Sequence, residues 1–230
     1  MISFKSVSKV YGKKDNAFVA IKDISIELPE HKTIAVVGKS GSGKSTFLHL
    51  LGGLDRPSEG SINISGKELT KLSKKAMDQY RGQDLGFVFQ SFFIEANQSC
   101  YQNVALPLEI NKVPLNKRRA IVEDALSQVD LTDKIRSKAG TLSGGQKQRL
   151  AIARAIVIKP KVILADEPTG NLDSATGDKV INLLFDLHKK YNVSLVIVTH
   201  DQDIAARCDV RVYIHDGQIE KVEGLKRVTL

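Results

Sequence analysis

The glycine-rich segment 38–45 combines the residue types that bind and activate a phosphate chain. It reads Gly-Lys-Ser-Gly-Ser-Gly-Lys-Ser and lies between the β-branched run 33–37 and an apolar segment that begins near Thr46. Glycines let successive backbone N–H groups turn inward around a phosphate, and a following helix directs its positive dipole end at the same anion. Lys44 then reaches the terminal phosphates, and the Ser45 hydroxyl ligates Mg²⁺. The spacing predicts a nucleotide-binding loop rather than a chance glycine-rich turn. The expected binding residues are Gly38, Lys39, Ser40, Gly41, Ser42, Gly43, Lys44, Ser45 and Thr46.

Two carboxylates and a histidine follow other apolar runs and are suited to the same phosphates. Asp166 ends such a run and fits a water-mediated contact to the metal. Glu167 comes next, before Pro168, which favours extended backbone at residue 167. Glu167 is suited to orienting and deprotonating an attacking water, with a purely structural glutamate as the alternative. His200 directly follows the run 194–199 and would reach the terminal phosphate from there, although a lone histidine is commonly structural.

The segment 142–146 is a second candidate anion site. It reads Leu-Ser-Gly-Gly-Gln and precedes helix-like sequence, so that a serine N-cap, two exposed glycine N–H groups and a helix dipole coincide. Because segment 38–45 already supplies a complete phosphate cradle, we expect this second site to serve the nucleotide of another copy in a head-to-tail dimer. The residues assigned to it are Leu142, Ser143, Gly144, Gly145 and Gln146.

Buried strands that alternate with helices predict an α/β fold around these segments. The continuous apolar runs 33–38, 161–166 and 194–199 are typical of strands buried on both faces, and hence of a parallel sheet. Residues 1–30 alternate between apolar and polar in short runs that are typical of further strands.

The middle of the chain is different, because it shows helical periodicity and no buried strand. Helices are predicted over 115–129 and 145–158. We therefore expect one domain over residues 1–230. In it, 1–90 and 159–230 form the nucleotide-binding core with a β subdomain, and about 91–158 form an inserted helical subdomain.

The composition is that of an ordinary globular protein. Of the 230 residues, 42% are hydrophobic and 26% are charged, which excludes a disordered chain, a collagen and a coiled-coil rod. No apolar run approaches the roughly 20 residues of a membrane-spanning helix, so we expect a soluble cytoplasmic protein. Two cysteines without CxxC spacing indicate reduced thiols. The net charge of +8 suits nucleic acid, an anionic membrane or a polyphosphate ligand and does not choose among them.

Taken in order, these motifs resemble those of the nucleotide-binding subunit of an ABC transporter, from about residue 2 to 220. The resemblance implies a P-loop NTPase fold, with a RecA-like parallel-sheet core, an N-terminal antiparallel β subdomain and an inserted helical subdomain. It implies ATP as the nucleotide and Mg²⁺ as the cofactor. Three more positions match family motifs: Gln90 after Gly-Phe-Val-Phe, Asp173 in Gly-Asn-Leu-Asp, and Tyr11 as the aromatic that stacks on adenine. For Tyr11, an ordinary strand-end tyrosine is the alternative. The implied catalytic residues are Lys44, Gln90, Glu167 and His200, and the implied metal ligands are Ser45, Gln90 and Asp166.

Within the family, the chain resembles the branch of the lipoprotein-releasing LolD, macrolide-exporting MacB and antimicrobial-peptide-resistance ATPases. The resemblance is carried by the segments 52–57, 86–90, 103–108 and 169–173. It implies an ATP-bound homodimer on an integral-membrane permease, at the cytoplasmic face of a bacterial membrane, that moves a lipoprotein, peptide or drug. No nucleic-acid partner is expected. The alternatives are an FtsE-like cell-division regulator and a non-transport ABC ATPase that acts on nucleic acid or ribosomes.

The segment after Gln90 departs from the pattern of this branch. Ser-Phe-Phe-Ile-Glu-Ala-Asn stands where an Asn-Leu-Leu-Pro type is usual, and Gln102 replaces a common glutamate. Because this stretch faces the permease in the family, the departure concerns the identity of the partner and leaves hydrolysis untouched. Phe92 and Phe93 form either a docking patch, which we favour, or part of the core.

Overall fold

A computed structural model describes residues 1–13 and 16–225 of the chain, which divides into two compact units. The first combines Met1–Asp78 with the chain from Val196 onward, and the second spans Gln79–Leu195. The boundaries fall within helix α2 (Lys74–Gln83) and strand β8 (Ser194–Thr199). The two predicted phosphate segments therefore belong to different units, 38–45 to the first and 142–146 to the second.

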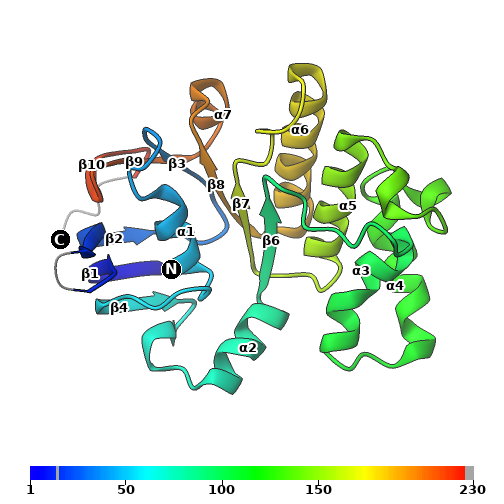
Figure 1. Cartoon of the computed structure of the whole chain (residues 1–230), viewed down its shortest axis with the longest axis horizontal. Helices are drawn as coiled ribbons and strands as arrows, with labels where there is room; N and C mark the ends of the chain where they lie inside the picture. The colour runs from blue at the N-terminus through cyan, green and yellow to red at the C-terminus, as the bar shows by residue number, and fades with distance from the viewer. Residues whose placement is uncertain (14–15, 226–230) are drawn as a thin grey trace. The chain divides into compact units, whose positions relative to one another are not determined.

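The first unit contains an antiparallel sheet with the strand order β2-β1-β4-β5 (Figure 1). Ile2 pairs with Leu28 and Phe4 with Ile26, which places the apolar side chains of β1 and β2 on one buried face. The prediction of an N-terminal antiparallel β subdomain is confirmed. The strands are β1 (Ile2–Tyr11), β2 (Phe18–Leu28), β4 (Glu59–Ile64) and β5 (Lys67–Glu68), with a short 3₁₀ turn at Leu69–Lys71.

The same unit contains a parallel pair that leads into the predicted nucleotide loop. Strand β3 (Thr33–Val37) is buried along its whole length and pairs in parallel with β9 (Val210–His215), which forms an antiparallel hairpin with β10 (Gln218–Glu223). Helix α1 (Lys44–Leu51) follows the loop, and its Phe47 ring stacks on the Phe4 ring of β1 with a centroid separation of 4.4 Å. This contact joins the loop helix to the antiparallel sheet. Helix α7 (Gln202–Ala206) follows β8.

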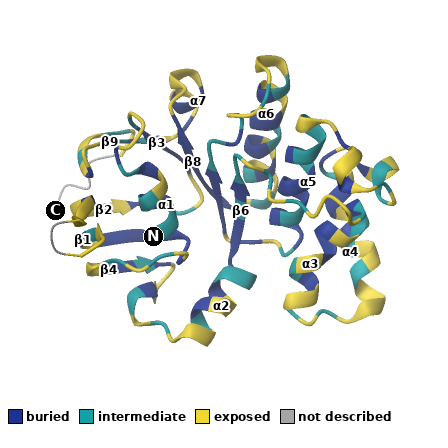
Figure 2. Ribbon diagram, in the orientation of Figure 1, coloured by how far each residue is buried: buried dark blue, intermediate teal, exposed yellow. Residues whose placement is uncertain are grey.

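The second unit combines a parallel strand pair with most of the helices. Strand β6 (Leu85–Phe89) pairs in parallel with β7 (Val162–Asp166), and Figure 2 shows the strands buried and the outward face of α4 exposed. Within 91–158 the described structure consists of helices and loops with one isolated antiparallel bridge, Ser99 to Lys138, and the helices predicted at 115–129 and 145–158 are found as α4 and α5. That this stretch is an inserted helical subdomain stays a prediction. The helices are α3 (Cys100–Ile110), α4 (Leu115–Ser127), α5 (Gly144–Ile156) and α6 (Ser174–Tyr191), with 3₁₀ turns at Thr132–Lys134 and Ala139–Thr141.

Candidate functional site

The predicted phosphate loop lies between β3 and α1 and is held by close backbone contacts within the first unit. Gly43, at the N-cap of α1, has a φ of 103°, and a Cβ there would lie 2.5 Å from the Ala20 carbonyl oxygen. A Cβ on Gly38 would lie 2.3 Å from the carbonyl oxygen of Ile214. Both positions therefore exclude any other residue without a shift of the backbone. The Gly217 N–H also donates to the Ser42 carbonyl, at 3.0 Å.

Two polar side chains of this loop are buried and suited to a phosphate. The Lys44 side chain is folded onto its own loop, where Nζ donates to the Lys39 carbonyl at 2.8 Å, and the residue is only 6% exposed. The Ser42 hydroxyl is buried and has no hydrogen-bond partner among the described residues. A buried hydroxyl without a partner costs about 1–3 kcal/mol, and a phosphate oxygen in this loop would satisfy it. The cradle fits a polyphosphate.

Two further predicted residues lie in the first unit. Tyr11 ends β1, and its hydroxyl donates to Asp55 Oδ2 at 2.8 Å. His200 follows β8 and precedes a rigid turn: Asp201 N–H donates to the Thr199 hydroxyl at 3.0 Å, and the Asp201 carboxylate caps α7. Strand β8 neighbours β3, so His200 follows the strand beside the one that leads into the loop.

In the second unit, the strand register brings Gln90 and the predicted carboxylates to one edge. Phe89 pairs with Asp166, and these are the last residues of the adjacent parallel strands β6 and β7. Gln90 and Glu167 follow them directly, so they lie at the same edge. The Gln90 carbonyl accepts a hydrogen bond from Asn171 Nδ2 at 3.0 Å. The expectation of extended backbone at Glu167 is wrong, because Glu167 has a φ of 44°. A turn closes here, with Gly170 N–H donating to the Glu167 carbonyl at 3.0 Å, and the positive φ is the kind of local strain found at functional positions.

Gln148 is a residue that the sequence analysis did not single out. It lies on α5, is fully buried, and its Nε2 donates to the Pro168 carbonyl at 2.6 Å and to the Phe89 carbonyl at 3.3 Å. Those carbonyls belong to the residues next to Glu167 and Gln90. Gln148 therefore ties together the two segments that present them. The sequence signal for its burial is an amide on the same helix face as Ala151 and Ile152, but that signal does not reveal its partners.

The 142–146 segment forms a helix start with a complete capping box. The Ser143 hydroxyl accepts the Gln146 N–H at 3.3 Å, and Gln146 Oε1 accepts the Ser143 N–H at 3.0 Å. Leu142 is buried beneath it, and a Cβ on Gly145 would lie 2.3 Å from Thr176 Cγ2. The segment is thus locally rigid and packed against α6.

Asp173 begins that same helix α6. Its side chain accepts the Thr176 N–H at 3.0 Å, and hydrogen bonds with Thr176 hold the pKa of Asp173 below its usual range. Because Gly145 packs on Thr176, the predicted anion segment and Asp173 are joined through one threonine.

The predicted metal ligands are oxygen donors, and they would share the ion with the phosphates of a nucleotide. Among the described residues, no group of three or more His, Cys, Asp or Glu side chains is placed to hold an ion. The predicted ligands are a hydroxyl (Ser45), an amide (Gln90) and a carboxylate (Asp166), the oxygen donors that suit Mg²⁺ shared with phosphates. The cysteines play no part: both are buried and unpaired, and burial raises the pKa of Cys208 to about 12.

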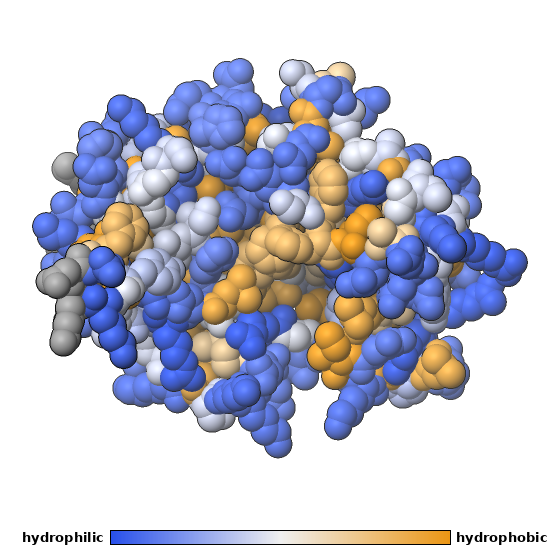
Figure 3. All heavy atoms as spheres, viewed as in Figure 1, coloured by the Kyte–Doolittle hydropathy of each residue, from blue (hydrophilic) through white to orange (hydrophobic). Residues whose placement is uncertain are grey.

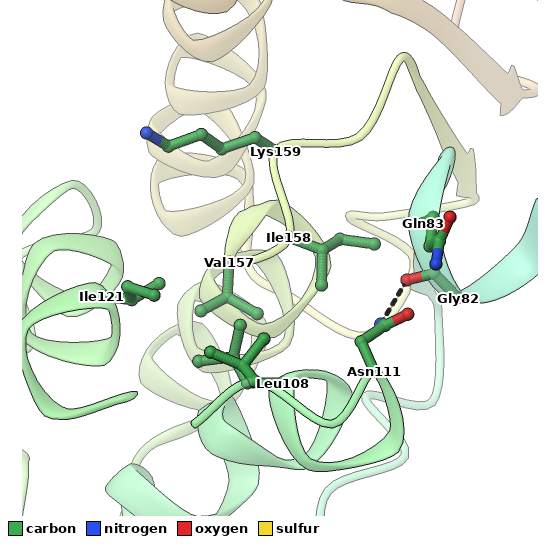
Figure 4. A pocket seen from close by; sticks show the side chains of 9 residues that line it. Gly82, Gln83, Leu108, Asn111, Ile121, Val157, Ile158 and Lys159 are labelled. Carbon is green, nitrogen blue, oxygen red and sulfur yellow. Dashed lines mark hydrogen bonds between the residues drawn. The ribbon is translucent and has the colours of Figure 1, made fainter. Parts of the chain in front are cut away.

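A cavity of about 380 Å³ lies in the second unit, and no predicted site residue lines it (Figure 4). Asn111 supplies a polar group to its wall and donates to the Gly82 carbonyl at 2.6 Å. A largely apolar wall cannot bind a triphosphate, so the cavity is not the nucleotide site. It is lined by Gly82, Gln83, Leu108, Asn111, Val113, Ile121, Val157, Ile158 and Lys159.

Known proteins match the chain in both sequence and fold. The ABC transporter family model matches residues 21–170. The lipoprotein-releasing system ATP-binding protein LolD of Legionella pneumophila (strain Lens) is 41% identical over 95% of this chain and 96% of its own length. The macrolide export ATP-binding/permease protein MacB of Bdellovibrio bacteriovorus is 38% identical over 98% of this chain, which covers 34% of that longer protein. The dimeric post-hydrolysis structure of the ATP-binding cassette MJ0796, bound to ADP and Pi, has a TM-score of 0.89 at 36% identity and covers 98% of this chain and 99% of its own.

Replacing Gln148 by Met, which has a similar length and no amide, is expected to lower kcat for ATP about 10- to 100-fold, because the Gln90 and Glu167 segments lose their common anchor. The free energy of unfolding should fall by about 1–3 kcal/mol. A steady-state phosphate-release assay with urea unfolding measures both. Gln128→Met, at the partly exposed end of α4, is the control. Wild-type turnover in Gln148→Met would contradict the anchoring role.

Proposed function

The chain belongs to the ABC transporter family, and from that premise we propose that two copies close head-to-tail around two MgATP to drive a membrane permease. ATP binding and hydrolysis are the activity of this family, whose model and LolD relatives the chain matches. The observation that carries the proposal is the built phosphate loop, with a buried Lys44 and an unpartnered Ser42 hydroxyl, in a chain that carries a second, capped anion segment at 142–146.

The loop of one copy would bind the phosphates of ATP. In the structure Lys44 Nζ donates to the Lys39 carbonyl, which is a neutral acceptor. With ATP bound, Nζ would donate to charged phosphate oxygens instead, and this makes a stronger hydrogen bond. Ser45, Gln90 and Asp166 would hold Mg²⁺, which when bound neutralises phosphate charge. Tyr11 would contact the adenine.

Glu167 would act as the general base. Glu167 directly follows Asp166, the last residue of the buried strand β7. Its carboxylate therefore stands at the end of a rigid strand, and its left-handed backbone turns the chain sharply there. This placement suits a group that must orient one water toward the γ-phosphate and accept its proton. His200 would hold the departing phosphate, and Gln90, anchored through Gln148, would complete the site.

The 142–146 segment would bind the γ-phosphate of the ATP held by the other copy. At Gly144 and Gly145 its capped helix start carries backbone N–H groups whose own residues have no side chain to shield them. Since ADP lacks the phosphate that this segment binds, ATP favours the closed dimer and hydrolysis removes that preference. The similar MJ0796 cassette, which is dimeric and bound to ADP and Pi, supports a nucleotide-bound dimer.

The partner would be an integral-membrane permease of the LolD and MacB type, with the chain attached at the cytoplasmic face of a bacterial membrane. Among the described residues, no helix is long and apolar enough to span a membrane. On the face drawn in Figure 3, hydrophilic residues predominate and apolar residues gather in patches. Phe93 is 64% exposed and rests edge-on against Phe89 at 5.0 Å, while Arg154 donates to the Phe92 and Phe93 carbonyls. A rigidly presented, exposed aromatic supports a docking role for this segment.

Glu167→Gln should lower ATP turnover by at least about 100-fold and leave ATP binding intact, because the amide cannot accept the proton of the attacking water. The variant should accumulate as an ATP-bound dimer, which size-exclusion chromatography detects. Glu123→Gln, on exposed α4, should behave as wild type. Turnover near the wild-type rate in Glu167→Gln would exclude Glu167 as the base.

Ser143→Arg should abolish ATP-driven dimerisation in the Glu167→Gln background while monomers still bind ATP, because the new side chain fills the space for the partner's γ-phosphate. Analytical ultracentrifugation with and without ATP measures this. Ser99→Arg removes an equivalent capping box from α3 and controls for loss of the cap. Unaltered dimerisation of Ser143→Arg would contradict a role toward the second copy.

Affinity purification of the tagged chain from detergent-extracted membranes of its own cells should recover a permease in near-stoichiometric amount, as mass spectrometry will show. Phe93→Ser should reduce that recovery several-fold. Leu115→Ser is the control, because Leu115 is also exposed, at 74%, and lies outside the segment after Gln90. Recovery only in the soluble fraction, with nucleic acid or ribosomes, would support the non-transport alternative instead.

A further inference from the structure

Asp55 is the centre of a polar network beside the phosphate loop of the first unit. Its Oδ1 accepts Lys9 Nζ at 2.6 Å and the Arg56 N–H at 2.7 Å, and its Oδ2 accepts the Tyr11 hydroxyl at 2.8 Å. The Tyr11 oxygen also has a hydrogen bond with the side chain of Thr46, in the first turn of α1. The network therefore links the end of β1 to both ends of the loop helix.

The chain positions these groups by local geometry. Lys9 and Tyr11 are two residues apart near the end of β1, and the side chains of both reach Asp55. Asp55 follows α1, and its N–H donates to the His49 carbonyl at 3.3 Å, which folds the connection back along the helix. The Asp55 side chain thus meets Tyr11 and Lys9 although 44 and 46 residues separate them in sequence.

Lys9 also covers one face of the Tyr11 ring. Its ammonium nitrogen lies 4.8 Å from the ring centroid, within the range of a cation–π contact. The Lys9 side chain is only 12% exposed, so it is held in place rather than mobile in solvent. With the hydroxyl fixed and one face covered by Lys9, a planar ligand could stack only on the opposite face of the Tyr11 ring.

We propose that Asp55 is a positioning residue of the ATP site: it holds the Tyr11 hydroxyl, with Lys9 on one side of the ring, so that the opposite ring face receives adenine. The inference rests on the proposed function, since it takes Tyr11 as the adenine contact. A tyrosine already fixed in its binding orientation loses less side-chain entropy when the base stacks on it. Asp55 therefore acts on base binding through Tyr11 and does not itself contact the nucleotide.

The protonation states favour this arrangement. Burial opposes ionisation of Asp55, yet the hydrogen bonds from Lys9 and Tyr11 hold its pKa below the usual range. Burial and the Asp55 hydrogen bond raise the pKa of Tyr11. At neutral pH the phenol is therefore the donor and the carboxylate the acceptor, which makes the hydrogen bond charge-assisted.

Calorimetric titration without Mg²⁺, so that no turnover occurs, separates base binding from phosphate binding. Asp55→Ala should raise the Kd for ATP about five- to tenfold and leave the Kd for inorganic tripolyphosphate, which has no base, unchanged. In steady state KM should rise while kcat stays within about twofold. In a Tyr11→Phe background, which lacks the hydroxyl, Asp55→Ala should change the Kd for ATP less than about twofold.

The matched control is Glu223→Ala. Glu223 is a paired carboxylate of the same unit, with Arg211 at 2.8 Å and a side-chain exposure of 28% against 29% for Asp55. It should leave both affinities at the wild-type value. Lys9→Met provides a second variant in case Asp55→Ala does not fold, and it should also weaken ATP alone.

Four results would overturn the inference. Equal weakening of ATP and tripolyphosphate by Asp55→Ala would show general support of the loop. An undiminished effect of Asp55→Ala in the Tyr11→Phe background would show that it acts independently of Tyr11. A Tyr11→Ala variant with wild-type ATP affinity would remove the adenine contact of the proposed function as well. If Tyr11→Ala weakens ATP binding and Asp55→Ala does not, only the inference about Asp55 fails.

Discussion

The phosphate loop depends on backbone contacts with strands that are far from it in sequence. Gly43 approaches the Ala20 carbonyl of β2, Gly38 approaches the Ile214 carbonyl of β9, and the turn of the β9–β10 hairpin donates from Gly217 to Ser42. The same turn accepts the Lys22 N–H at 2.8 Å through the Gly217 carbonyl. The antiparallel sheet and the C-terminal hairpin therefore brace the loop from two sides. This support explains how a run of small polar residues keeps one conformation, and how a lysine and a serine hydroxyl remain buried there.

In the second unit, side chains rather than close backbone contacts hold the site segments in place. The segments that carry Gln90 and Glu167 leave a strand edge as loops, where backbone order is ordinarily lowest. A buried amide from α5 and a helix cap at Asp173 restrain them. Because α5 also begins at the 142–146 segment, one helix carries the proposed contact to the second copy at its start and the anchor of the proposed hydrolytic residues within its second turn.

Much of this arrangement could be predicted from neighbouring residues, and the rest depends on contacts that form only in the folded chain. The run 33–37, the helix over 115–127 and the capped start at Ser143 follow from apolar periodicity and cap chemistry, which involve neighbouring residues only. The left-handed backbone of Glu167 did not follow, because the turn closed by Gly170 overrides the usual effect of Pro168. Gln148 and Asp55 also escaped prediction. Their roles consist of contacts 20 to 59 residues away for Gln148 and 44 to 46 residues away for Asp55, and no sequence spacing encodes such contacts.

The helix caps in the described part of the chain differ in whether the capping group still carries a hydrogen to donate. Aspartates cap α6 and α7, and serines cap α3 and α5, although the two residue types serve about equally well as N-caps. A carboxylate that caps a helix can only accept hydrogen bonds, and a phosphate oxygen also only accepts them, so neither can donate to the other. The Ser143 hydroxyl uses a lone pair for the Gln146 N–H and keeps its own hydrogen. At the start of α5, therefore, the cap remains a donor, so this helix end can receive an anion where an aspartate in the same place would repel it.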